Sequence, residues 1–196
     1  MGMTEICQEM KSCRSCRMRS GCIQVVPPTG NLVNPILLIV GESPGEDEDE
    51  RGEPFCGDCG QLLRQYLRQT GVIKRSNTTI TNVLNCRPPN NKFPKDNCAE
   101  ICYSLWLSRI IKELAPKRML LLGGVPLEYV AGLSGITANR GRWITARGIR
   151  TMATYHPSYV MRNMNSGGIK EVQQFESDIA KVAVEVRLLD QGLVIE

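Results

Sequence analysis

Short runs of apolar and β-branched residues recur along the chain and predict the strands of a sheet. Segments with apolar residues at helical spacing lie between and after these runs. Strands that alternate with helices favour a single three-layer α/β/α domain with a central, mostly parallel sheet of about four strands. The predicted strands are 36–40, 78–84, 118–124 and 149–155, and the predicted helices are 62–67, 97–114, a short one around 127–129, and 170–188.

The length of 196 residues suits one domain with its own core, so we expect a single domain over 1–196 whose α/β core spans 35–190. Residues 1–34 carry several cysteines and end in VPPTGNLVNP, which predicts a loop-rich N-terminal arm. The segment 140–157 predicts a hairpin-like approach to the last strand. In the helix at 97–114 we expect a core face formed by Ile101, Leu105, Ile110, Ile111 and Leu114.

The composition is that of an ordinary globular protein, with 42% hydrophobic and 22% charged residues. No apolar stretch approaches the roughly 18 residues of a membrane span. The start MGMTEICQEM has neither the charged nor the apolar region of a signal peptide. We therefore expect a protein of the cytoplasm, at the nucleoid or an equivalent intracellular site, without membrane association. We also expect it to act as a monomer. The formal charge of +4 is compatible with a polyanionic partner but does not require one.

Nine cysteines are unusual for a chain without a secretion signal, and they indicate metal or redox chemistry. Cys13 and Cys16 form a C-x-x-C pair, and fifteen residues separate Cys86 from Cys102. Four thiolates from two such places can hold a structural zinc ion or a cubane iron-sulfur cluster, and the spacing leaves both open. The remaining cysteines complete no second site and are interpreted as small apolar residues, namely Cys7, Cys22, Cys56, Cys59 and Cys98.

Two polar motifs follow predicted strands, GESPGEDED at 41–49 and HPSYVMRN at 156–163, and the second contains the only histidine. Asn82 and Asn91 lie at and after the end of another predicted strand. Ligand sites form at this edge of parallel sheets, so we expect these residues to meet there. The first motif predicts a tight turn that lets backbone amides approach a ligand. The chain lacks both G-x-G-x-x-G and a Walker lysine, which argues against a dinucleotide or P-loop site.

These residues resemble a known family. GESPGEDEDERGEPFCGDCGQLL, TNVLNCRPPNN and YHPSYVMRN are similar to the signature blocks of family 4 uracil-DNA glycosylases, the iron-sulfur branch of the uracil glycosylase superfamily. The resemblance extends from Cys13 to about Asn163 and includes the cysteine spacing. It implies hydrolytic release of uracil from DNA, which initiates base excision repair. It also implies a 4Fe-4S cluster held by Cys13, Cys16, Cys86 and Cys102, with zinc as the less favoured occupant.

The resemblance also implies roles for single residues. Phe55 would stack on the flipped uracil, Asn82 would read its Watson-Crick edge, and His156 would face its O2. Glu42 and Glu48 match the motif-one carboxylates, which would hold the attacking water or offset charge on the sugar. Gly41 and Asn91 complete the expected substrate-binding set. We expect the DNA backbone to contact Arg87, Lys92, Arg140, Arg142 and Arg162.

The sequence departs from the pattern at three positions. Ser43 stands where a related branch has a water-activating aspartate, so the group that activates water stays open. Asp58 and Cys59 replace a basic and a small residue, which weakens one expected phosphate contact.

Two other functions remain alternatives at this level. One is a non-catalytic or covalently trapping uracil-binding relative. The trapping branch carries an extra basic loop with a histidine, and the single histidine here favours turnover. The other alternative is a zinc-stabilised nucleic-acid-binding module, which would be colourless and would release no uracil.

Overall fold

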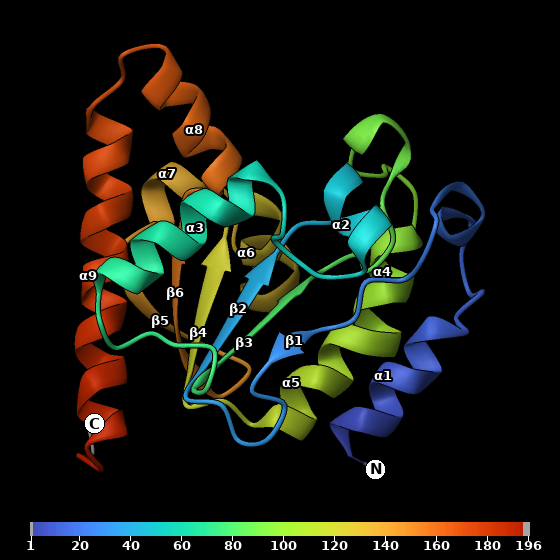
Figure 1. Ribbon diagram of the computed structural model, residues 1–196, viewed down its shortest axis with the longest axis horizontal. Helices are drawn as coiled ribbons and strands as arrows, with labels where there is room; N and C mark the ends of the chain where they lie inside the picture. Colours follow the sequence, from blue (N-terminus) through green and yellow to red (C-terminus); the bar gives the residue numbers. More distant parts are fainter. Residues whose placement is uncertain (1, 194–196) are drawn as a thin grey trace.

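The computed structural model describes residues 2–193, and within them one mixed sheet has six strands in the order β1-β3-β2-β4-β6-β5 (Figure 1). The central strands β3, β2, β4 and β6 are parallel, and both edge strands are antiparallel to their neighbours. The strands are β1 (Thr29–Gly30), β2 (Leu37–Gly41), β3 (Thr78–Asn82), β4 (Arg118–Leu122), β5 (Trp143–Ala146) and β6 (Ile149–Thr154).

The predicted strands are confirmed as this parallel centre, and β5 with β6 forms the expected hairpin. The count of about four strands is too low because it omits the two edges. β1 is only two residues long, so it leaves no apolar run in the sequence.

The predicted helices are also present, and several further helices occur in segments for which we predicted none. The α-helices are α1 (Met3–Lys11), α2 (Glu46–Arg51), α3 (Asp58–Gln69), α4 (Cys98–Cys102), α5 (Ser108–Leu114), α6 (Gly124–Ala131), α7 (Ile136–Asn139), α8 (Pro157–Asn165) and α9 (Lys170–Asp190). Short 3-10 turns lie at Arg17–Gly21 and Pro89–Asn91, and a π turn at Tyr103–Leu107 joins α4 to α5. Within residues 2–193 no helix combines the length and the apolar character needed to cross a membrane.

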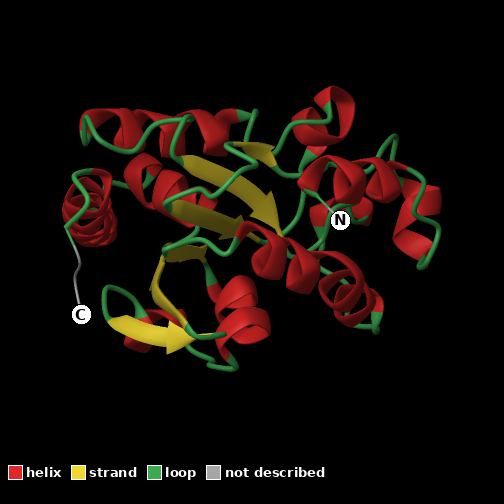
Figure 2. Ribbon diagram, turned by 90° about the horizontal axis from the view of Figure 1, so that it is seen from below, coloured by secondary structure: helices red, strands yellow, loops and turns green. Residues whose placement is uncertain are grey.

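Side chains that alternate along β2 enter two separate apolar layers, because successive residues of a strand point to opposite faces. Leu37 and Ile39 pack in one cluster with residues of α3 and α9, whereas Leu38 and Val40 pack in the other with residues of α1, α5 and α6. Figure 2 shows helices on both faces of the sheet. The three-layer α/β/α prediction is therefore confirmed.

The N-terminal arm is more ordered than predicted, and the expectation of a loop-rich segment is wrong for its first part. Met3, Ile6 and Met10 recur at helical spacing on α1 and are buried in the core layer that contains α5. This spacing was readable in the sequence. The arm thus contributes to the main core rather than covering it from outside.

The π turn changes which residues of the segment 97–114 face the core. Ile110, Ile111 and Leu114 are buried as predicted, but the Leu105 side chain is 37% exposed. Trp106 and Leu107 are buried in its place. A π turn contains an extra residue, so it rotates the preceding part of the helix relative to the periodicity that follows.

Candidate active site

The carboxyl ends of the parallel strands bring the two polar motifs together, as predicted. Gly41 and Asn82 are the last residues of β2 and β3 and are paired in register. His156 follows β6, which lies two positions from β2 and three from β3 in the sheet. A pocket of about 320 Å³ lies at this edge and is lined by Glu42, Ser43, Pro44, Gly45, Glu48, Phe55, Cys59, Asn82, Asn91, His156, Ser158, Tyr159 and Arg162.

Glu48 fastens the first motif to the segment that follows it. Its Oε2 accepts a hydrogen bond from the backbone N–H of Gly45, and its Oε1 accepts one from the N–H of Gly57, each at 2.9 Å. A glutamate at this position of the first turn also caps α2. The Glu48 carboxylate therefore holds the start of α2 against the start of α3, and both of its oxygens are engaged.

Glu42 has a different environment, although it lines the same pocket. Its side chain is partly buried, and burial raises the pKa of its carboxyl above the usual value. Within the described residues, no side chain forms an ion pair with it. A carboxylate that is poorly hydrated and without a countercharge is suited to take up a proton.

Asn82 and Phe55 form one wall of the pocket around Gly41. The Asn82 side chain is buried, and its Oδ1 has no hydrogen-bond donor within the part of the chain that the structure describes. A Cβ at Gly41 would overlap both this Oδ1 and the Phe55 ring. Phe55 has a φ of 55°, a backbone conformation that non-glycine residues rarely adopt and that often marks functional sites. An orphaned amide oxygen beside an aromatic ring fits a flat ligand that carries an N–H group.

His156 lines the same pocket and is the N-cap residue of α8. Its Nδ1 accepts a hydrogen bond from the backbone N–H of Ser158 at 3.2 Å and lies 2.8 Å from the Ser158 Oγ. Burial, and secondarily the positive charge of Arg162, lowers the pKa of His156 from 6.5 to about 4. The imidazole is therefore neutral at pH 7, and its proton is assigned to Nε2 because Nδ1 is an acceptor. Its ring centroid is 5.9 Å from that of Phe55.

The backbone at His156 is extended, with φ −69° and ψ 138°, a conformation that the following Pro157 favours. Pro157 occupies the first helical position, where its missing N–H costs no hydrogen bond. Gly123, after β4, lies close beneath the histidine, since a Cβ there would be 3.2 Å from the His156 Cβ. Two neighbouring strand ends thus fix the histidine backbone.

The rim of the pocket is formed by the loop after Cys86. Arg87 donates through Nε to Asn91 Oδ1 at 2.9 Å and pairs with Glu46 at 3.1 Å. Asn90 and Asn91 both have a φ of 54°. The Arg87 side chain therefore connects α2 to this strained loop, and its guanidinium is already partnered on two sides.

The other basic residues expected at DNA fall into two groups. Arg162 lines the pocket and is exposed, and Lys92 and Arg142 are exposed as well. Arg140 instead forms an ion pair with the fully buried Asp178 and donates to the Gln174 carbonyl. These contacts hold the Arg140 guanidinium against α9.

All four of the predicted cysteine ligands line one small cavity. Cys13 and Cys16 belong to the arm, Cys86 lies in the loop after β3, and Cys102 is the last residue of α4. The Asn85 Nδ2 donates to the Cys102 Sγ at 3.3 Å, and burial raises the pKa of Cys102 to about 11. Among residues 2–193, no three Cys, His, Asp or Glu side chains form a group that could hold a single metal ion.

Two cysteines that we interpreted as isolated thiols lie beside this group. Cys22 interacts with Cys86, and Cys98 interacts with Cys16. Cys59 lines the active-site pocket, where burial raises the pKa of its thiol. Spacing in the sequence gave no signal for any of these placements.

Ser158, Tyr159 and Asp49 are further contributors that the sequence reasoning missed. Ser158 orients His156, and Tyr159 lines the pocket. Their signal was their position directly after the histidine within the second motif. Asp49 is buried and accepts hydrogen bonds from the backbone N–H groups of Ile23 and Gln24, so it ties the arm to α2.

The fold and the pocket define an α/β protein with a site at the carboxyl edge of its parallel strands. Residues 27–180 match the model of the uracil DNA glycosylase superfamily, and the chain belongs to this superfamily. It is 34% identical to the type-4 uracil-DNA glycosylase of Archaeoglobus fulgidus, covering 92% of this chain and 91% of that protein. It is 37% identical to the type-4 uracil-DNA glycosylase of Thermotoga maritima, covering 84% and 85%. A type-5 uracil-DNA glycosylase of Pyrobaculum aerophilum is 29% identical, over 72% of this chain.

Proposed function

We propose that this protein is a uracil-DNA glycosylase that hydrolyses the N-glycosidic bond of deoxyuridine in DNA, releasing uracil and leaving an abasic site for base excision repair. The observation that carries this proposal is the pocket lined by the unpaired Asn82 Oδ1, the Phe55 ring and the neutral His156. A uracil inside a duplex is out of reach, so the nucleotide must leave the stack to enter the pocket.

Uracil recognition is assigned to Asn82 and Phe55. The orphaned Asn82 Oδ1 would accept the N3–H of uracil, and the same amide would donate to O4. Cytosine presents an acceptor at N3 and a donor at its amino group, so it mismatches both positions. Phe55 would stack on the base. Gly41 is needed at the end of β2 because any side chain there would displace both groups.

Bond cleavage is assigned to His156 and Glu42. Cleavage leaves negative charge on the departing uracil, mostly at O2, and positive charge on the sugar. The Nε2–H of a neutral His156 can donate to O2 as this charge develops. Glu42 would hold and deprotonate the attacking water, because its carboxylate is unpaired and its pKa is raised. Glu48 acts as a positioning residue, since both of its oxygens bind backbone amides.

The four thiols Cys13, Cys16, Cys86 and Cys102 are assigned to a structural 4Fe-4S cluster, with zinc as the less favoured occupant. All four line one cavity, and thiolates are ligands of both groups. The similarity of the cysteine spacing to the iron-sulfur branch of the superfamily favours the cluster. When bound, the cluster would supply a rigid crosslink between the arm and α4. Arg87 follows Cys86 and donates to Asn91, so the cluster would also hold the rim of the pocket in place.

The DNA backbone is assigned to the exposed cations Lys92, Arg142 and Arg162, of which Arg162 lines the pocket. Arg87 instead holds the rim loop, and Arg140 is bound to α9. We further propose that residues 1–196 act as one monomeric domain. The shared core of α1 and the sheet supports this unit.

A strand-cleavage assay tests the proposed function. An end-labelled oligonucleotide with one uracil is incubated with the protein and divided into samples with and without alkali. We expect strand breakage only after alkali, together with free uracil detected by chromatography. The matched oligonucleotide with thymine at the same position should stay intact. Retention of uracil in a stable covalent complex would instead identify a trapping relative.

A further inference from the structure

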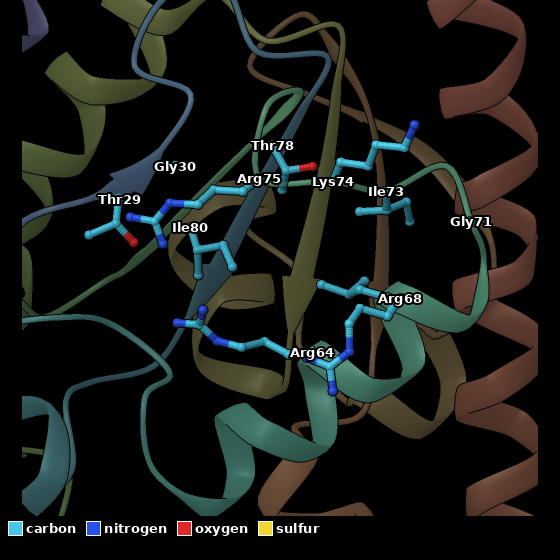
Figure 3. A pocket seen from close by; sticks show the side chains of 11 residues that line it. Thr29, Gly30, Arg64, Arg68, Gly71, Ile73, Lys74, Arg75, Thr78 and Ile80 are labelled. Carbon is cyan, nitrogen blue, oxygen red and sulfur yellow. The ribbon is translucent and has the colours of Figure 1, made fainter.

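A second cavity, of about 430 Å³, lies between α3, the edge strand β1 and the loop at 71–75 (Figure 3). Within the described residues, the two pockets share no lining residue. The floor of this second cavity is apolar and includes Leu67, Ile73 and Ile80. Its volume is that of a typical small-ligand site.

Positive charge surrounds the apolar floor. Figure 3 shows Arg75 on one side of Ile80 and Arg64 on the other, with Arg68 farther along α3. Glu53 pairs with Arg64 at 3.1 Å and with Arg75 at 2.9 Å, so a single carboxylate serves two guanidinium groups. Arg68 has no ion-pair partner within residues 2–193, and none of the described lining residues is acidic. The cavity therefore has an excess of positive charge beside a surface suited to a hydrocarbon or aromatic group.

We propose that this cavity binds a small phosphate monoester with an aromatic body, of the nucleoside monophosphate class. Guanidinium groups bind phosphate oxygens in a bidentate manner, and Arg68 and Arg75 are the groups with exposed side chains. The base would lie on Leu67, Ile73 and Ile80. This inference stands apart from the proposed glycosylase function, because the residues that carry it lie outside the active-site pocket.

Arg64 has a structural role that sets it apart from the other two arginines. Its Nε donates to the Phe55 carbonyl at 3.2 Å, and its guanidinium also donates to the Pro54 carbonyl. Substitution of Arg64 would therefore disturb the active site as well as the second cavity. The variant that tests the second cavity should therefore retain Arg64.

Isothermal titration calorimetry with deoxyadenosine monophosphate tests the proposal, because this ligand lacks the uracil edge. The parent protein should bind it more tightly than it binds deoxyadenosine or inorganic phosphate. Arg68→Glu/Arg75→Glu should weaken binding by about tenfold or more, because attraction to the phosphate becomes repulsion. Lys117→Glu/Lys170→Glu makes the same change in net charge at exposed residues outside the cavity and should retain the parental affinity.

Ile80→Trp provides a second variant that fills the floor without a change of charge, and it should cause a comparable loss. Circular dichroism must show parental folding for each variant. Absence of binding to the parent, or equal affinity for the parent and the pocket variants, would overturn the proposal. A third result would also overturn it: the parent does not bind the monophosphate, and Arg68→Glu/Arg75→Glu binds a uracil-free oligonucleotide more weakly than the parent does. The cavity would then be a DNA contact.

Discussion

The backbone N–H of Ser158 donates to the Nδ1 of His156, and this one bond determines which ring nitrogen carries the proton. The bond arises because His156 is the N-cap of α8 and Ser158 is the second residue of that helix. A cap accepts hydrogen bonds from free N–H groups of the first turn. The same contact that starts the helix thus leaves Nε2 as a donor toward the pocket.

We expect His156→Ala to lower the single-turnover rate of uracil release by at least about tenfold, because a donor to the developing anion is lost. Binding of uracil-containing DNA should change little, since this interaction strengthens only as the bond breaks. Quench-flow kinetics and a binding titration separate the two effects. A parental rate, or a loss explained by unfolding in circular dichroism, would assign His156 a structural role only.

Gly41→Ala should impair uracil release by about tenfold or more, since the added Cβ would displace Asn82 and Phe55 together. The matched control is Gly124→Ala, because a Cβ at Gly124 meets no atom within 4 Å. Rates of both variants on the same uracil oligonucleotide make the comparison. Equal activity of the two variants would show that the strand end can relax without cost.

Asn82→Asp should reduce the rate on uracil by about tenfold or more, because a carboxylate cannot donate to the O4 carbonyl. A protonated aspartate presents a different edge, so a slight gain of activity on cytosine is expected at low pH. Paired assays on uracil and cytosine oligonucleotides measure both changes. Unchanged kinetics on uracil would mean that Asn82 only ends the strand.

The dependence of the rate on pH should reflect Glu42. Its carboxyl must be ionised to accept a proton, and its raised pKa places the loss of activity on acidification above the usual range of a glutamate. Glu42→Gln should be slower, and its rate should lack the acidic limb of the pH profile, that is, the loss of activity on acidification. His156 is neutral down to about pH 4, so His156→Ala should be slower at every pH and keep the limb.

The opposite result, in which only His156→Ala loses the fall in activity at low pH, would refute this assignment.

The lowered pKa of His156 also affects the stability of the folded protein. Between pH 6.5 and about 4 the unfolded chain binds this proton more strongly than the folded chain. The contribution of His156 to the free energy of unfolding is therefore complete above pH 6.5 and is lost as the pH falls toward 4. Chemical denaturation of the parent and of His156→Ala across this window measures it.

Protein purified without oxygen should contain about four irons per chain and show broad visible absorbance. Cys86→Ala should lose iron and melt at a lower temperature, because the crosslink between the arm and α4 is gone. Cys7→Ala, a thiol of α1 outside the cavity, should retain both properties. A colourless parent with one zinc would contradict the cluster.

Much of the fold was predictable because the relevant signals are local. The apolar runs that became β2, β3, β4 and β6 need no partner to be recognised, and their alternation with helices implies a parallel sheet with motifs at one edge. The π turn at Tyr103–Leu107 was not predictable in this way, because tertiary packing decides whether a helix accepts an extra residue. Leu105 is exposed for that reason.

The sequence by itself determined the family, the parallel strands and the residue types of the site, since each is written in contiguous motifs and their periodicity. Only the tertiary structure decided what these residues do. It engages both oxygens of Glu48 with backbone amides and leaves Glu42 unpaired, and it joins Arg140 to Asp178 of α9. The motifs could not distinguish these roles, because hydrogen-bond partners and burial depend on segments that are remote in sequence and adjacent only after folding.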